Sequence, residues 1–396
     1  MNRSKEDGFL SRIRVMDFTT NLAGPYATRF LRMLGAEVIR VEHGRRLDVL
    51  RRRTESDFNA VNPGKMSITI DLKSPKGMEL AKRLINISDV VVESFRPGVM
   101  AELGLGYDVV RDVKPDIVMV SISGFGATGP ERNFASWASI FASMSGVSYL
   151  TGYADGIPTE FRGTFDTRAG QMAAFAVMLG LTHRQKTGQG QYIDVSAIEQ
   201  QICSIGEVVM DYTMNGRIGE RMGNRDTHKA PHNCYRCAGD DCWVSIAVGN
   251  DEEWKALCVA MGQPELFEDD RFKNPLSRWQ NQEALDEIIT SWTVGHADNE
   301  VMEILQKAKV AAMPVMSAPE IFEDPHLQRR NFIHTVEHPQ IGKRFVFATP
   351  WRISGDPSYV PKRGPLLGEH NNDVFCDLLG MSPEEVSRLI EEKVIS

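Results

Sequence analysis

The first half of the chain alternates short apolar runs with longer segments in which apolar residues recur at helical spacing. Five of the short runs are predicted to be strands: Arg12–Phe18, Glu37–Val41, Ser67–Leu72, Val90–Val92 and Ile117–Val120. The longer segments predict helices, one over Tyr26–Leu34 that ends at Gly35, and one from Pro75 to about Ile87 after a Ser74 cap. This alternation predicts an α/β fold with a Rossmann-like, mainly parallel, doubly wound sheet.

In sheets of this kind, ligands bind beyond the carboxyl ends of the strands. The loops expected at those ends are Thr19–Gly24, Glu42–Arg53, Glu93–Gly98 and Ser121–Pro130. They are the first places to look for binding residues.

The pattern changes after about residue 214, which predicts a second domain. A long helix is expected over Ser196–Met214, before a polar, glycine-rich stretch. The predicted organisation is a large Rossmann-like domain over 1–214, a linker over 215–232, a small α+β domain over 233–324, a return linker over 325–342 and the C-terminal part of the large domain over 343–396. Within the small domain we expect β structure over Cys234–Val248 and helices from Asp251, from about Gln282 and from about Asn299. A capping box at Ser382 opens a closing helix to about Lys393.

Composition is that of an ordinary globular protein. The 396 residues include 42% hydrophobic residues and carry a formal charge of −8, so nucleic-acid binding, which usually needs a basic surface, is not expected. No apolar run approaches the roughly 20 residues of a membrane helix, and Met1–Arg14 lacks the apolar core of a signal peptide. Six cysteines do not form a disulfide framework, so a cytoplasmic location is the default expectation.

One carboxylate stands out in the stretch Gly163–Gly170. Asp166 precedes a long run of small and apolar residues with helical character, which ends at the turn Thr187–Gln191 and a strand over Tyr192–Val195. We expect Asp166 at or just before the helix N-terminus, where free N–H groups and the helix dipole favour an anion. At this point Asp166 is either a simple helix cap or a functional carboxylate.

Arginines are concentrated between residues 42 and 53. The five are Arg45, Arg46, Arg51, Arg52 and Arg53. In an acidic protein, such a cluster after a sheet strand suits a phosphate-rich ligand, and a solvated surface helix is the alternative. No phosphate-binding GxxxxGK[ST] loop occurs, and no GxGxxG follows the first strand, so neither a nucleoside triphosphate nor a dinucleotide is predicted.

Other catalytic motifs are missing from the sequence. Cys234 and Cys237 form a CxxC with Cys242 and His232 nearby, but no second CxxC follows, so neither a zinc site nor a redox centre is predicted. There is no GxSxG elbow and no HExxH. By elimination, Asp166 is the best candidate for a nucleophile or base.

Nine stretches occur in an order that resembles the class III CoA-transferases of the formyl-CoA and carnitine CoA-transferase type. The resemblance covers residues from about Arg12 to about Val374. The matching stretches are Val15–Pro25, Leu34–Ile39, Ser67–Gly77, Glu93–Gly98, Leu103–Tyr107, Ser123–Gly126, Thr187–Ser196, Tyr235–Cys237 and Leu367–His370.

The resemblance implies a covalent mechanism centred on Asp166, because the matching aspartate is the nucleophile in that family. Its carboxylate would attack the thioester of a donor acyl-CoA, giving a mixed anhydride and then an aspartyl-CoA thioester, from which CoA passes to an acceptor carboxylic acid. Backbone N–H groups would stabilise the oxyanions. Coenzyme A is then a substrate, and no metal or redox cofactor is implied.

The same matching assigns eight residues to coenzyme A binding. They are His43, Arg51, Ile70, Leu72, Lys73, Ser94, Phe95 and Arg96. Arg51 and Lys73 would hold phosphates, while the apolar members would contact adenine or pantetheine. From the residues alone, Leu72 could equally be core and Lys73 a surface lysine.

The chain also departs from formyl-CoA transferase. Leu22 matches a glutamine that holds the small acyl group, Glu102 matches a CoA-contacting arginine, and a glycine-rich loop over the site has no clear counterpart, since Gly219–Gly223 is a poor substitute. Oxalate is therefore not the expected acceptor. A less polar acid is expected, such as the aromatic or branched acids of the benzylsuccinate, phenyllactate, bile-acid or carnitine branches, with Trp137 as a wall of the acyl pocket.

Two other functions stay open. A 2-methylacyl-CoA racemase shares the fold but needs a titratable histidine where this chain has Trp137 and Ala138. A non-catalytic acyl-CoA-binding subunit of a heteromer is the second alternative, although Asp166 is present. The resemblance further implies an interlocked dimer, either a homodimer or a heteromer with a related chain, and succinyl-CoA or acetyl-CoA as the donor.

Overall fold

Six parallel strands form the central sheet in the computed structural model, which describes residues 8–161, 163–354 and 361–396. The first seven residues of the charged stretch Met1–Arg14 therefore lie outside the description. The strand order is β3-β2-β1-β4-β5-β6. The chain adds strands toward one edge up to β3 and toward the other edge from β4 onward, so the topological switch point lies between β1 and β4, which are themselves parallel. The strands are β1 (Arg14–Phe18), β2 (Glu37–Glu42), β3 (Met66–Thr69), β4 (Val90–Glu93), β5 (Val118–Ser123) and β6 (Gln191–Ser196). This is a doubly wound α/β sheet, as predicted.

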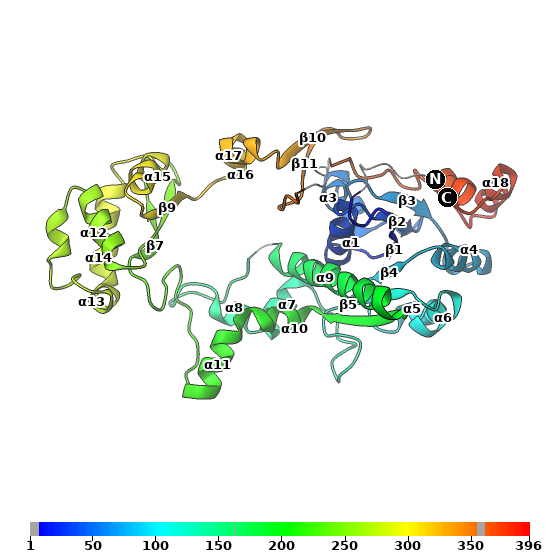
Figure 1. The fold of residues 1–396 in the computed structure, drawn as a ribbon, viewed down its shortest axis with the longest axis horizontal. Helices are drawn as coiled ribbons and strands as arrows, with labels where there is room; N and C mark the ends of the chain where they lie inside the picture. The colour runs from blue at the N-terminus through cyan, green and yellow to red at the C-terminus, as the bar shows by residue number, and fades with distance from the viewer. Residues whose placement is uncertain (1–7, 162, 355–360) are drawn as a thin grey trace. The chain divides into compact units, whose positions relative to one another are not determined.

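Helices connect these strands and cover both faces of the sheet (Figure 1). Those that precede β6 in the chain are α1 (Ala23–Met33), α2 (Val49–Arg53), α3 (Glu55–Val61), α4 (Pro75–Asn86), α5 (Val99–Glu102), α6 (Tyr107–Val113), α7 (Ala138–Met144), α8 (Val147–Leu150) and α9 (Thr164–Thr187). Two more, α10 (Ala197–Ile202) and α11 (Gly206–Asn215), follow β6, and α11 has no buried residues. Helix α1 begins three residues earlier than predicted. Pro25 is tolerated there because the first hydrogen bond of the helix comes from the Tyr26 N–H, so no donor is lost.

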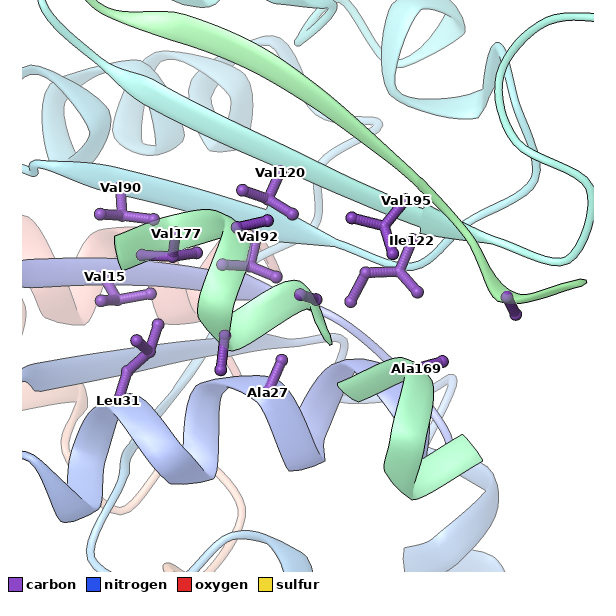
Figure 2. Packing of buried hydrophobic residues seen from close by; sticks show 14 of the residues in the cluster. Val15, Ala27, Leu31, Val90, Val92, Val120, Ile122, Ala169, Val177 and Val195 are labelled. Atoms are coloured by element: carbon purple, nitrogen blue, oxygen red, sulfur yellow. The ribbon is translucent and has the colours of Figure 1, made fainter. Parts of the chain in front are cut away.

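Alternate residues of each strand face opposite sides of the sheet and build two separate cores. Val90 and Val92 point to the side covered by α1 and α9, where Ala27, Leu31 and Val177 complete the packing (Figure 2). Val91 points to the other side, toward apolar residues of α4, α6 and α18 (Pro383–Glu391). Strands β1 to β5 are therefore buried on both faces, while the edge strand β6 stays partly exposed, so a ligand has access to the sheet at its edges and strand ends.

The chain divides into two compact units. The first consists of residues 1–147, 160–217 and 325–396, and the second of residues 148–159 and 218–324. The first unit also holds α17 (Pro325–Arg329), the antiparallel pair β10 (Ile333–His338) and β11 (Gly342–Phe347), and a π-helix, η3 (Asp373–Leu378). A compact unit is not by itself an independently folding domain, so the domain boundaries drawn from the sequence stay a prediction.

The second unit has its own sheet and core. Its strands, in the order β7-β8-β9, are β7 (His232–Arg236), β8 (Trp243–Ala247) and β9 (Ala311–Pro314). Its helices are α12 (Asp251–Ala260), η2 (Pro264–Phe267), α13 (Pro275–Gln280), α14 (Gln282–Thr293), α15 (Asp298–Lys307) and α16 (Ala318–Glu323). Trp254 and Leu257 of α12 are fully buried beside residues of α14 and α15. The predicted β structure and three helices are confirmed, whereas β9 was not predicted.

The prediction of a single helix over Ser196–Met214 is wrong. A 3₁₀ turn, η1 (Cys203–Ile205), divides this segment into α10 and α11. The Ser204 hydroxyl donates to the Gln201 carbonyl at 2.6 Å, and Gly206 comes two residues later, so a competing hydrogen bond and a poor helix former interrupt the helix. The capping box at Ser382 is confirmed.

No helix in the described ranges is both long enough and apolar enough to span a lipid bilayer.

Candidate active site

Side chains of its own first turn fix the beginning of α9. The helix starts after Gly163, whose φ of +72° is a left-handed conformation that favours glycine. The Thr164 hydroxyl donates to the Phe161 carbonyl at 2.9 Å, and the Thr167 hydroxyl donates to the Gly163 carbonyl at 2.8 Å. Asp166 is the third residue of this turn, so it lies inside the helix rather than before it.

The Asp166 carboxyl is half-buried in the first turn of α9. Burial raises its pKa above the ordinary value of 3.8, and the negative charge of Glu160 raises it further. Gly163 holds the cap position and no side chain caps the helix, so the simple interpretation of Asp166 as an N-cap is wrong. A poorly hydrated carboxylate is a stronger nucleophile and base than one in water, so the position suits either role.

Two neighbours hold this turn in place from below. Gly170 lies directly against α1, because a Cβ added to it would come within 2.5 Å of the Ala23 carbonyl oxygen. On the other side, the buried Gln201 donates from its amide nitrogen to the Phe165 carbonyl at 3.2 Å. The backbone that carries Asp166 is therefore packed between α1 and α10.

A pocket of about 770 Å³ opens beside the carboxyl ends of β1, β2 and β4, the edge where ligands bind in sheets of this type. Its walls come from the loops after these strands and from the segment that follows β3. The volume lies in the range usual for sites that hold small molecules and cofactors. Its lining residues include Thr19, Thr20, Arg40, Glu42, Arg46, Asp48, Arg52, Val99 and Glu102.

Five of the eight residues assigned to coenzyme A from the sequence line this pocket. They are His43, Ile70, Leu72, Lys73 and Phe95. Asp71 organises the polar part of the group, since its carboxylate accepts from the Lys73 backbone N–H at 3.0 Å and lies 3.7 Å from the His43 imidazole. Lys73 is exposed and Ile70 is buried, so a charged end and an apolar wall share one pocket.

Arg51 has a different environment from the one expected of a phosphate ligand. Its buried guanidinium donates to the Glu42 carboxylate at 2.8 and 2.9 Å, to Glu55 at 3.0 Å and to the Pro365 carbonyl at 2.9 Å. It also stacks on the Phe58 ring, with the guanidinium carbon 3.4 Å from the ring centroid. Its donors are thus engaged within the protein, and Arg51 does not line the pocket described above.

Ser94 and Arg96 also lie outside the pocket lining. The Ser94 hydroxyl accepts from the Thr20 N–H at 3.0 Å and lies 3.3 Å from the Thr20 carbonyl, so it fixes the loop after β1. Arg96 directly follows Phe95 in the same loop, and its side chain is exposed.

The two residues assigned to the acyl pocket lie on different elements. Leu22 is the cap residue of α1 and packs against Leu50 and Phe58. Trp137 is the cap residue of α7 and is 66% exposed. The structure does not bring these two together in one described pocket.

Sequence reasoning did not single out Asp48, although a simple signal marks it. Asp48 caps the short helix α2, where its Oδ1 accepts from the Leu50 N–H at 2.7 Å. Its Oδ2 accepts from the Arg40 guanidinium at 2.6 Å. An aspartate followed by a helix-forming run is a common cap pattern, and that signal would have placed Asp48 at this loop.

Within the described ranges, no group of three or more histidine, cysteine or carboxylate side chains is arranged to hold a metal ion. Cys234 lies on β7, Cys237 follows that strand, and Cys242 precedes β8; all three are free thiols.

Comparison with known proteins identifies the family. The model of CoA-transferase family III matches residues 10–371. The chain belongs to this family. It is 35% identical to the succinyl-CoA–D-citramalate CoA-transferase of Chloroflexus aurantiacus, over 98% of each chain. It is 34% identical to the alpha subunit of a succinyl-CoA–L-malate CoA-transferase from the same species, over 98% of this chain and 92% of that subunit.

Solved structures agree with this family. A CAIB/BAIF family protein from Brucella suis superposes with a TM-score of 0.86 at 29% identity, covering 94% of this chain and 100% of that one. The protein is therefore a CoA-transferase, an enzyme that uses coenzyme A as a substrate, and the racemase alternative is set aside.

Proposed function

We propose that this CoA-transferase moves coenzyme A from succinyl-CoA to a short dicarboxylic acid by covalent catalysis at Asp166. The half-buried carboxylate in the first turn of α9 carries the proposal, because burial strengthens it as a nucleophile. The names of the relatives from Chloroflexus aurantiacus support succinyl-CoA as donor and favour an acid such as citramalate or malate. Such acids are larger than oxalate but still carry two carboxylates and a hydroxyl group, so in this proposal they replace the aromatic acceptors considered from the sequence.

The reaction proceeds through two anhydrides and one thioester. An Asp166 oxygen attacks the donor thioester carbonyl, the C–S bond breaks, and the thiolate of coenzyme A leaves. The thiolate then attacks the Asp166 acyl carbon, which releases the donor acid and forms the aspartyl-CoA thioester. The acceptor carboxylate attacks that thioester, and the thiolate released recaptures the acceptor acyl group, which frees Asp166. Backbone N–H groups at the start of α9 stabilise the oxyanions.

The pocket beside β1, β2 and β4 is proposed to hold the nucleotide part of coenzyme A. His43, Ile70, Leu72, Lys73 and Phe95 contact it, and the exposed Arg46 and Arg52 take the phosphate role expected of Arg51. Ser94 and Arg51 act by supporting the loops around the pocket, and the exposed Arg96 stays a proposed coenzyme A residue. Leu22 and Trp137 remain the proposed residues of the acyl site.

The enzyme is also proposed to act as an interlocked dimer, either with itself or with a related chain. The similarity to a malate CoA-transferase alpha subunit supports a heteromer as one form of this assembly. Phe175 and Leu179 on α9 and Met210 and Tyr212 on α11 are large apolar residues that are exposed in the single chain. Their exposure supports a protein partner that covers these two helices. The cytoplasmic location expected from the sequence stays a prediction.

Chemical trapping tests the nucleophile directly. After incubation with succinyl-CoA, hydroxylamine should convert Asp166 to a hydroxamate that peptide mass spectrometry locates, and Asp166→Asn should give no adduct and no turnover. Asp108→Asn is the matched control, since Asp108 lies in the first turn of α6 and is not part of the proposed site. Near-normal transfer by Asp166→Asn would refute the nucleophile. An unmodified wild-type chain that still binds CoA would instead support the binding-subunit alternative.

A further inference from the structure

Asp48 connects two parts of the first unit that have different tasks in the proposed reaction. One oxygen, Oδ1, caps α2 through the Leu50 N–H. The other, Oδ2, accepts from the Thr20 hydroxyl at 3.1 Å and from the Asn21 N–H at 3.2 Å. The same carboxylate therefore ties α2 to the loop between β1 and α1.

The α2 side of this connection belongs to the nucleotide pocket. Arg46 and Arg52 lie just before and after Asp48 in sequence, both are exposed, and both line the pocket. Helix α2 has five residues, and so short a helix is not stable without external contacts. A phosphate bound by these arginines would therefore fix the segment that Asp48 caps.

The loop between β1 and α1, on the other side of Asp48, is joined through α1 to the helix that carries the proposed nucleophile. Asn21 has a φ of +62°, an unusual conformation for a residue other than glycine, and Asp48 stabilises it through the Asn21 N–H. Leu22 follows as the cap of α1, and the first turn of α1 lies against Gly170, one turn after Asp166 on α9. A shift of this loop would therefore move the surface on which the start of α9 rests.

A buried charge network keeps Asp48 in place. Arg40, 1% exposed, donates to Asp48 at 2.6 Å and lies 3.6 Å from Asp17. Lys65, also buried, donates to Asp17 at 3.0 Å and to the Pro25 carbonyl at 2.9 Å. Two cations and two carboxylates thus brace the loop after β1 from both of its ends.

We infer that Asp48 is a positioning residue that converts binding of the CoA nucleotide into correct placement of Asp166. This inference rests on the proposed function. Enzymes can use binding energy from a distant, unreactive part of a substrate to raise kcat, and a substrate that lacks this part then loses kcat rather than affinity alone. Asp48 is the residue through which this coupling passes.

The test compares two thioesters of succinic acid, one with coenzyme A and one with pantetheine, which lacks the nucleotide. Asp48→Asn keeps an oxygen to cap α2, since asparagine is as good a cap as aspartate, but its amide nitrogen cannot accept from Thr20, Asn21 and Arg40. We expect kcat with the CoA thioester to fall about tenfold or more, whereas kcat with the pantetheine thioester changes far less.

A second, less disruptive variant keeps the inference testable if Asp48→Asn does not fold. Thr20→Val removes the hydroxyl that donates to Asp48. It should lower the ratio of kcat with the CoA thioester to kcat with the pantetheine thioester, by a smaller factor than Asp48→Asn does. Thr54→Ala is the matched control, because the Thr54 hydroxyl accepts from the Asp57 N–H at 3.0 Å and so caps the neighbouring helix α3, while its link to α2 is made by its backbone N–H and survives the substitution. It should leave the ratio at the wild-type value.

The outcomes separate this inference from the proposed function. An equal loss with both thioesters in the Asp48 and Thr20 variants would overturn the positioning role and leave the transferase proposal intact. A wild-type enzyme that transfers coenzyme A from no donor would overturn the proposed function, and this inference with it.

Discussion

At the scale of single residues, the charge of Glu160 acts on the pKa of Asp166. Both burial and Glu160 raise the pKa of the Asp166 carboxyl, so the ionised, nucleophilic form is lost at a higher pH than for an ordinary aspartate. The acid limb of kcat/KM should report this pKa if Asp166 is the nucleophile of the free enzyme.

Glu160→Gln removes the charge and should move that acid limb to lower pH. A neutral neighbour no longer disfavours the Asp166 anion, so the pKa of Asp166 falls. At a given acidic pH a larger fraction of Asp166 then stays ionised, and less activity is lost. A pH profile of kcat/KM with succinyl-CoA measures the shift. An acid limb that stays at the wild-type pH would show that another group controls it.

Arg51 shows what a sequence can and cannot predict about a single residue. The arginine cluster after β2 correctly indicated a basic region, and Arg46 and Arg52 line a pocket there. The environment of Arg51 depends on Glu42, Glu55 and the distant Pro365, which the fold brings together. No local pattern distinguishes an arginine with buried carboxylate partners from one that faces a ligand.

At the scale of elements, the close approach of α9 to α1 should control both stability and catalysis. Gly170→Ala would place a methyl group 2.5 Å from the Ala23 carbonyl oxygen and 2.9 Å from the Tyr26 Cβ, so the two helices must move apart. We expect a loss of about 1–3 kcal/mol in the free energy of unfolding, measured by urea denaturation. Because a displacement of about 1 Å can cost roughly a hundredfold in rate, kcat should fall by a factor of at least ten.

Gly180→Ala is the matched control on the same helix. A methyl group there would lie 2.6 Å from a Val118 methyl carbon, so packing suffers, but far along α9 from Asp166. This variant should lose stability and keep kcat. If both variants lose kcat equally, general loosening of α9 explains the effect rather than displacement of its first turn.

Regular elements were predictable where the local pattern and the tertiary environment agree. Strands β1 to β5 of the central sheet are buried on both faces, and short apolar runs such as Val90–Val92 mark several of them in the sequence, whereas the edge strand β6 is partly exposed. The division between α10 and α11 depends on one serine hydroxyl that competes for a backbone carbonyl. The β10–β11 pair has exposed, mixed residues and needs its own cross-strand register, so the same reasoning did not detect it.

At the scale of the whole molecule, α9 has two apolar faces and its own unit covers only one. Ala169, Ala173 and Val177 are buried against α1 and the sheet. Met172, Phe175 and Leu179, spaced by three and four residues, form a second face that is exposed in the single chain. A helix that is apolar on opposite sides is usually buried on both, which points to a second subunit.

Phe175→Asp tests whether this second face is a subunit interface. Phe175 is 58% exposed, so a charge there costs little in an isolated chain but would be buried without a partner in a dimer. The wild-type enzyme should sediment with twice the mass of one chain, and the variant with the mass of a single chain and with little transferase activity. Val259→Asp is the matched control, because Val259 of α12 is 60% exposed on the second unit and should tolerate the charge without a change in mass. A wild-type protein with the mass of a single chain would exclude the homodimer, and the related subunit of a heteromer would then be the partner that covers α9.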